Sequence, residues 1–254
     1  MVTLSVQEWG WQFAARSAPA LSNISFDIEQ GERVLLLGAS GVGKSTLLRA
    51  LAGVLGEDEG ASSGKLLINS VAPENSRGTV GLVLQDPENQ IILERVGDDV
   101  AFGCENLGVP REEIWGRVKH SLSLVGLDVP LSQPTSALSG GQKQRLALAG
   151  VLAMQPEIIA LDEPTANLDP AGAAQLKKAV TEVADATGAT IIMVEHRVDL
   201  WWDFASRIIV VGHEGVLWDG QPTALPPATA QLLDAAGVWL PHKVIPTSDK
   251  HTGT

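Results

Sequence analysis

The sequence has little of what secreted, nucleic-acid-binding and membrane-spanning proteins need. A single cysteine, Cys104, allows no internal disulfide, which fits a reducing compartment. With 18 basic against 30 acidic residues the net charge is −12, so the chain lacks the basic face that nucleic acid or an anionic lipid surface requires. No apolar run approaches the roughly 18 residues that span a bilayer. We therefore expect no nucleic-acid partner, and we expect any link to a membrane to pass through another protein.

The remaining composition is that of a globular α/β protein. Alternating or wholly apolar runs predict strands at residues 3–13, 21–28, 34–37, 66–68, 79–84, 158–161, 190–194 and 207–211, with a loop at 56–64. Helical periodicity predicts helices at 111–125, from 142 to 153, and at 171–186. The simplest architecture is a parallel α/β core, residues 1–84 and 153–225, interrupted by a helical insert, residues 85–152. Residues 226–254 are expected to form a short helix followed by a disordered tail.

A glycine-rich loop with the pattern G-x-x-x-x-G-K-S follows the apolar strand at 34–37. It consists of Gly38, Ala39, Ser40, Gly41, Val42, Gly43, Lys44, Ser45 and Thr46. Such a loop turns successive backbone N–H groups inward at a helix N-terminus, where they bind phosphate. Lys44 would then bridge the β- and γ-phosphates, and the Ser45 hydroxyl would bind Mg²⁺. An ordinary glycine turn is the alternative, but the strand before and the helix formers after it favour a nucleoside-triphosphate site.

Two further patterns supply chemistry for such a site. The apolar strand at 158–161 ends in Asp162 and Glu163, where the first carboxylate would hold Mg²⁺ and the second would act as general base. A strand-end acid pair that caps a helix is the alternative. A second helix opens after Leu138 with the residues Ser139, Gly140, Gly141 and Gln142. Their N–H groups form either a second anion site or a flexible cap.

The motifs and their order resemble those of the ABC-transporter ATPases. They are the phosphate loop, Gln85 at a strand end, the LSGGQ run, the Asp-Glu pair and His196 after a strand. The resemblance implies a P-loop NTPase (RecA-like) core with an N-terminal antiparallel β part and an inserted ABC-type helical subdomain. It also implies ATP and Mg²⁺ as cofactors, bound in a head-to-tail dimer between one subunit's phosphate loop and the other's Ser139–Gln142.

The same resemblance assigns four more roles. Gln85 senses Mg²⁺ and water and is a ligand of the metal site, and His196 contacts the γ-phosphate as the switch histidine. The loop 167–169 crosses the dimer interface. Phe13 takes the place of the aromatic residue that stacks on adenine, with Trp11 as its rival.

A closer resemblance lies after Gln85. The runs QDPENQ (85–90), DDVAFG (98–103) and ENLGVP (105–110) are similar to the ATPase subunits of energy-coupling-factor importers, which take up vitamins, cobalt or nickel. This implies a subunit on the cytoplasmic face of the cell membrane, with an integral membrane coupling subunit and a substrate-binding membrane subunit as partners. The dimer could be a homodimer or a heterodimer with a second ABC ATPase. The alternatives are another importer or exporter class, or a soluble ABC ATPase acting as an assembly or scaffold factor.

The stretch after Gln85 also carries an expectation about partner docking. Ile91, Ile92 and Leu93 either pack locally or dock a membrane subunit. Gln90 and the acidic pair at 98–99 are expected to be polar surface positions that tolerate substitution.

Overall fold

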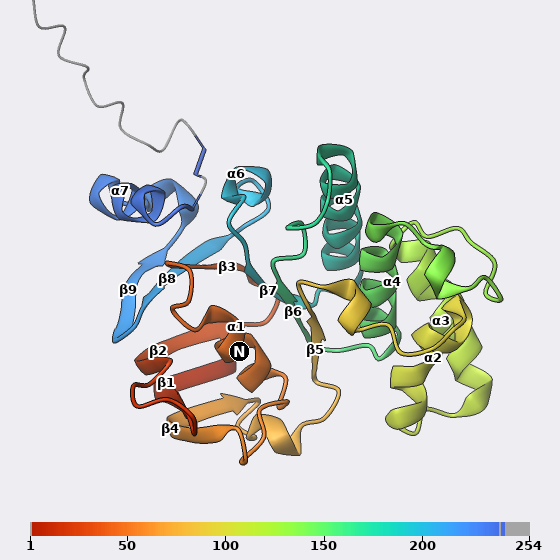
Figure 1. Cartoon of the computed structure of the whole chain (residues 1–254), viewed down its shortest axis with the longest axis horizontal. Helices are drawn as coiled ribbons and strands as arrows, with labels where there is room; N and C mark the ends of the chain where they lie inside the picture. The colour runs from red at the N-terminus through yellow and green to blue at the C-terminus, as the bar shows by residue number, and fades with distance from the viewer. Residues whose placement is uncertain (1, 239, 242–254) are drawn as a thin grey trace, which may run out of the picture.

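The computed structural model describes residues 2–238, 240 and 241, and the strands of this part form two sheets (Figure 1). One is a three-stranded antiparallel sheet in the order β2-β1-β4, and the other is a six-stranded sheet in the order β5-β6-β7-β3-β8-β9. The strands are β1 Val2–Phe13, β2 Leu21–Glu29, β3 Arg33–Leu37, β4 Gly60–Ile68, β5 Val80–Val83, β6 Ile158–Asp162, β7 Thr190–Val194, β8 Arg207–Gly212 and β9 Gly215–Gly220. The expected α/β class, with an antiparallel part at the N-terminus, is confirmed.

The helices cover the larger sheet and extend beyond one of its edges. They are α1 Lys44–Leu51, α2 Val96–Asn106, α3 Arg111–Leu124, α4 Gly140–Ala153, α5 Pro170–Thr187, α6 Val198–Trp201 and α7 Pro227–Ala235. In Figure 1, α2, α3 and α4 gather on the β5 side of the sheet, away from the antiparallel strands. No helix in the described part of the chain is long and apolar enough to cross a membrane.

The centre of the larger sheet is made of strands that are buried on both faces. Every residue of β6 and β7 is buried, as a continuous apolar run between helical layers requires. Strand β7 pairs in parallel with β6 on one side and with β3 on the other. Val194, the last residue of β7, is in register with both Leu36 and Asp162. The three strands therefore end close together, and the loops that follow them start from one edge of the sheet.

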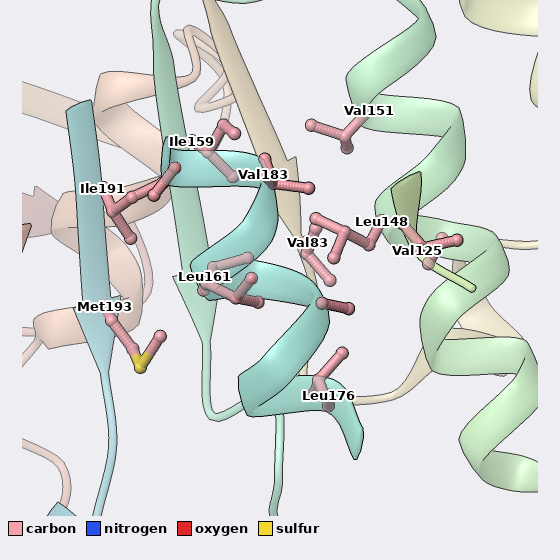
Figure 2. Close-up of a cluster of buried hydrophobic side chains, with 14 of the residues drawn as sticks. Val83, Val125, Leu148, Val151, Ile159, Leu161, Leu176, Val183, Ile191 and Met193 are labelled. Atoms are coloured by element: carbon pink, nitrogen blue, oxygen red, sulfur yellow. The ribbon is translucent and has the colours of Figure 1, made fainter. Parts of the chain in front are cut away.

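Helix α5 joins the sheet to the helical part. Figure 2 shows Leu176 and Val183 of α5 between Leu161 of β6 and the helix α4, whose Leu148 and Val151 point toward the same cluster. The packing of β5 against α4 is closer still, because a Cβ on Gly81 would lie 2.2 Å from a Val151 methyl carbon. Only glycine lets strand and helix approach this closely.

Two strands differ from the prediction: β4 is longer than the predicted strand at 66–68, and β9 was not predicted. The loop predicted at 56–64 is wrong in its second half, because β4 begins at Gly60 and pairs with β1 as far as Phe13. The polar residues of β4 lie on an exposed edge strand, where alternation of apolar residues is not required. Strand β9 forms an unpredicted antiparallel hairpin with β8.

Helices α2, α3 and α4 all begin and end between residues 96 and 153, in the region expected to be the helical insert. The division of the chain at residues 85, 153 and 226 stays a prediction. Helix α7 lies in the expected C-terminal segment, while residues 242–254 of the tail predicted at 241–254 lie outside the described residues.

The buried side chains packed between α4, α5 and β6, which we call the α4–α5 cluster, should contribute strongly to stability. Leu148 is 1% exposed, so Leu148→Ala should lower the free energy of unfolding by about 2–5 kcal/mol through lost burial and the cavity left behind. Urea unfolding followed by circular dichroism measures this. Leu232→Ala is the matched control, since that leucine is 51% exposed on α7 and its loss should change stability by no more than about 0.5 kcal/mol. Equal effects of the two changes would contradict the assignment of the core.

Candidate active site

The phosphate loop lies between β3 and α1, as predicted, and glycine is required at both of its ends. Gly38 and Gly43 have φ angles of 153° and 99°, and Gly43 is the residue before the first turn of α1. A Cβ on Gly38 would lie 2.4 Å from the Val211 carbonyl oxygen, and one on Gly43 would lie 2.6 Å from a Leu21 side-chain carbon. Close neighbours and left-handed backbone together exclude any side chain at these two positions.

Lys44 is the one cationic residue of this loop, and it is 5% exposed. Its Nζ donates hydrogen bonds to the carbonyl oxygens of Gly38, at 2.9 Å, and Ala39, at 3.0 Å. Burial lowers the pKa of Lys44, and the nearby carboxylates of Glu163 and Asp162 partly oppose this effect. The ammonium group is therefore held inside the loop, at a place where its charge is poorly solvated and an anion would stabilise it.

Asp162 ends β6 directly beside the start of α1. Its Oδ1 accepts a hydrogen bond of 3.0 Å from Ser45 Oγ, and the residue is 8% exposed. Burial raises the pKa of Asp162 despite the hydrogen bond from Ser45 and the attraction of Lys44. A hydroxyl and a buried carboxylate without full charge compensation are hard oxygen donors of the kind that Mg²⁺ prefers, so these two residues fit the expected metal.

Glu163 lies at the centre of the predicted catalytic groups. Its Oε2 accepts a hydrogen bond of 3.1 Å from Gln85 Nε2, and its Oε1 lies 3.2 Å from His196 Nε2. The backbone N–H of Glu163 donates to the Val194 carbonyl, and its φ of 45° is a left-handed conformation that non-glycine residues rarely adopt. Such strain is typical of residues held in place by a functional site. Residues from three separate loops thus converge on one carboxylate.

The adenine-stacking candidates differ in exposure. Trp11 is buried in the core at 6% exposed, whereas Phe13 at the end of β1 is only partly buried. The Arg16 guanidinium lies 5.5 Å from the centre of the Phe13 ring. The loop that follows Phe13 lines a pocket of about 380 Å³ together with Gly41 of the phosphate loop and His213. The greater exposure of its ring favours Phe13 over Trp11.

The LSGGQ run begins helix α4 and has a well-defined cap. Ser139 Oγ accepts from the Gln142 N–H at 3.4 Å, while Gln142 Oε1 accepts from the Ser139 N–H at 2.9 Å. This reciprocal pair is a capping box, so the segment is rigidly capped. Gly140 and Gly141 leave the first turn of α4 without side chains, and its remaining N–H groups face outward at a helix N-terminus.

Gln90 and Asp99 are half-buried and bonded to backbone groups, and the expectation that Gln90 and the acidic pair tolerate substitution stays a prediction. Gln90 bonds through its side chain to the Leu84 N–H and the Leu82 carbonyl, and so fastens the segment after Gln85 to β5. Asp99 Oδ1 accepts from the N–H groups of Ile92 and Leu93. Asp98 is exposed as expected. Two of the polar side chains thus replace backbone partners that a loop would otherwise lack.

The three apolar residues that follow Gln90 differ in burial, so local packing accounts for some of them and not for all. Ile91 packs against the core cluster, Leu93 is partly buried, and Ile92 is 61% exposed.

One residue of this region is not among those the sequence predicts for the site. Glu195 directly precedes His196 and is 2% exposed, and its carboxylate bonds to Thr165, two residues after Glu163. The only signal in the sequence is an acidic residue immediately after the fully buried strand β7, whose last four residues are apolar.

Residues 21–166 match the family model described as ABC transporter. The chain belongs to the ABC transporter family of ATP-binding proteins. This confirms the resemblance and the P-loop NTPase fold expected from the motifs. The chain is 44% identical over 205 residues to the energy-coupling factor transporter ATP-binding protein EcfA of Methanocaldococcus jannaschii, and the match covers 80% of this chain and 73% of that protein.

Two solved structures are similar to the cassette. CbiO1 of Clostridium perfringens, part of the ABC transporter complex CbiONQ, is 36% identical with a TM-score of 0.76, covering 87% of this chain and 89% of that one. An ATP-binding cassette solved as a dimer in a post-hydrolysis state with ADP and Pi is 25% identical with a TM-score of 0.73, covering 87% and 100%. Against three putative ABC transporter ATP-binding proteins of Methanosarcina species, the chain spans only 38% to 63% of the relatives' length.

The burial of Asp162 predicts how stability depends on pH. Because its pKa is raised, the folded protein binds this proton more tightly than the unfolded chain, and stability falls as pH rises through that pKa. Asp162→Asn keeps an acceptor for Ser45 but removes the buried charge, so in the absence of nucleotide it should raise the free energy of unfolding at pH 7 by up to about 1 kcal/mol.

Urea unfolding at pH 7 and pH 4.5 measures the effect, and the gain should shrink at the lower pH, because more of the parent protein then carries the proton. Asp128→Asn, at an exposed position, is the control and should change little at either pH. A destabilised Asp162→Asn protein at pH 7 would show that Asp162 contributes net favourable interactions instead.

Proposed function

We propose that the chain is the ATP-binding and ATP-hydrolysing subunit of an energy-coupling-factor importer, which powers uptake of a vitamin, cobalt or nickel through a membrane complex. The observation that carries the hydrolysis is Glu163, whose carboxylate meets Gln85 and His196 at the edge of the sheet where the phosphate loop begins. The importer class is supported by the relative named EcfA and by CbiO1. It acts at the cytoplasmic face of the membrane, through partner subunits.

ATP binding falls to the phosphate loop. Backbone N–H groups of residues 38–46 surround the phosphates at the start of α1, and Lys44 exchanges its two carbonyl partners for the β- and γ-phosphate oxygens. Ser45, Asp162 and Gln85 would hold Mg²⁺, which neutralises charge on the phosphates when bound. Phe13 stacks on the adenine ring.

Hydrolysis requires a base that faces the γ-phosphate. Glu163 accepts a proton from the attacking water as the water oxygen bonds to the γ-phosphorus and the bond to the leaving β-phosphate oxygen breaks. Gln85 orients that water, and His196 holds the Glu163 carboxylate and reaches the γ-phosphate. In a head-to-tail dimer, residues 139–142 of a second copy complete the site with the N-terminus of α4. The neighbour solved as a dimer supports dimerisation.

Glu163→Gln should lower ATP hydrolysis by about 10²–10⁴-fold while ATP binding persists, because the amide cannot accept the proton but leaves the phosphate loop unchanged. Phosphate release and nucleotide binding measure the two effects separately, and size-exclusion chromatography with ATP should show an accumulated dimer. Hydrolysis at the parental rate would remove Glu163 from the role of base.

The contrasting variant is Lys44→Ala, which removes a charge that meets the phosphates directly, so ATP binding itself should weaken. Parental ATP affinity in that variant would contradict the phosphate-loop assignment.

The importer hypothesis needs a membrane partner, and Ile92 marks a surface that it can contact. Its side chain is 61% exposed on the segment that starts at Gln85, so this surface is joined to the hydrolytic site. An apolar side chain displayed there fits a cytoplasmic helix of the coupling subunit.

Tagged parent should capture an integral membrane protein from mild detergent extracts of its own cells, and Ile92→Asp should reduce the capture by about tenfold, as expected for a buried charge in an interface. Leu217→Asp is the matched control, because that leucine is 56% exposed on β9 and should leave capture unchanged. If the parent captures no integral membrane protein, the chain is a soluble ABC ATPase acting as an assembly or scaffold factor. Capture of a partner together with a periplasmic-type binding protein would indicate another importer class.

A further inference from the structure

We propose that Glu195 and Thr165 form a clasp that positions His196 against Glu163, so that the loops following β6 and β7 act as one unit. The inference rests on the proposed hydrolytic function of this site, and it assigns a positioning role to two buried residues.

The clasp is a set of hydrogen bonds between two loops. Glu195 Oε1 accepts from the Thr165 N–H at 3.0 Å and also from the Thr165 hydroxyl, while Oε2 accepts from the His196 N–H at 3.2 Å. Thr165 is fully buried and Glu195 is 2% exposed. One side chain therefore bonds at the same time to the loop that carries Glu163 and to the backbone of His196.

Burial makes these bonds restrictive. A carboxylate out of water is stable only when donors surround it, and loss of one donor leaves an uncompensated group that costs more than an ordinary hydrogen bond. Burial raises the pKa of Glu195, and the bonds from Thr165 and from the backbone after it oppose that shift. Movement of either loop away from the other would break bonds that water cannot replace, so the loops are held in one relative position.

The geometry connects this restraint to the site. Glu163 and Glu195 follow paired residues of adjacent strands, Asp162 and Val194, and the Glu163 N–H bonds to the Val194 carbonyl. The two loops are thus joined at the strand ends and again at Thr165. The 3.2 Å contact between Glu163 and His196 lies on the loops so joined. Any change in the clasp should therefore appear as a change in where His196 lies.

The alternative is that this buried network only stabilises the fold. Thr165→Val removes the hydroxyl donor, whereas Thr165→Ser keeps it. Thr190→Val is the matched control for stability, because Thr190 is also fully buried and its hydroxyl accepts a hydrogen bond, from Gly31, away from the site. All three should retain ATP binding, and each valine variant loses one hydrogen bond made by the hydroxyl of a fully buried threonine.

We expect Thr165→Val to lower kcat for ATP by about tenfold with KM changed by less than about twofold, as for a misplaced catalytic group. Thr165→Ser and Thr190→Val should stay within about twofold of the parent. The deciding test is a double-mutant cycle with His196→Ala, in which Thr165→Val should lower kcat no further. The same tenfold loss in the His196→Ala background would overturn the proposal.

A second measurement does not depend on hydrolysis. The Cε1–H resonance of His196, identified among the five histidines by its loss in His196→Ala, should shift in Thr165→Val and Glu195→Gln but not in Thr165→Ser or Thr190→Val. An unshifted resonance in Thr165→Val would also overturn the clasp. If the parent protein hydrolyses no ATP, the proposed function fails, while this resonance still decides whether Glu195 and Thr165 position His196.

Discussion

The pairing of β7 with both β6 and β3 is the constraint on which the rest of the site depends. Val194 is in register with Leu36 and with Asp162, so three loops begin at one rung of the sheet. Hydrogen bonding between parallel strands fixes this register, and full burial of β6 and β7 prevents slippage, since a shift of one residue would turn every side chain to the opposite face of the sheet. Side chains carried by the loops are thereby placed within reach of one another.

The site itself opposes folding. Lys44 and Asp162 are both buried, and in each the charged form is disfavoured by loss of water. Their mutual attraction offsets only part of this cost. The apolar sheet and the α4–α5 cluster supply the stability that keeps the charges in place. Ligands of opposite charge would recover, on binding, the free energy that burying these charges costs. A protein with a weaker core could not hold this pair in the nucleotide-free state.

The sequence allows prediction where local pattern and function coincide. The strand, loop and helix around Lys44 follow from an apolar run, glycines and helix formers, whereas His196 was assigned to the site only by the family resemblance. The extent of β4 could not be predicted, because its polar residues are determined by pairing with β1 and not by burial. The hydrogen bonds of Gln90 to the backbone of residues 82 and 84 could not be predicted for a similar reason, since such bonds leave no periodic pattern in the sequence. The roles of the individual site residues stay predictions.

The fastening of the segment after Gln85 has a consequence for the thermodynamics of association. Gln90 bonds to β5, and Asp99 bonds to the backbone on which Ile92 lies. Ordering a flexible loop costs roughly 1–2 kcal/mol for each residue fixed, and this cost is subtracted from the affinity of any complex it enters. Here the ordering is completed when the chain folds. A surface prepared in this way can bind and release a partner with a small change in entropy, and its affinity can be set by a few side chains.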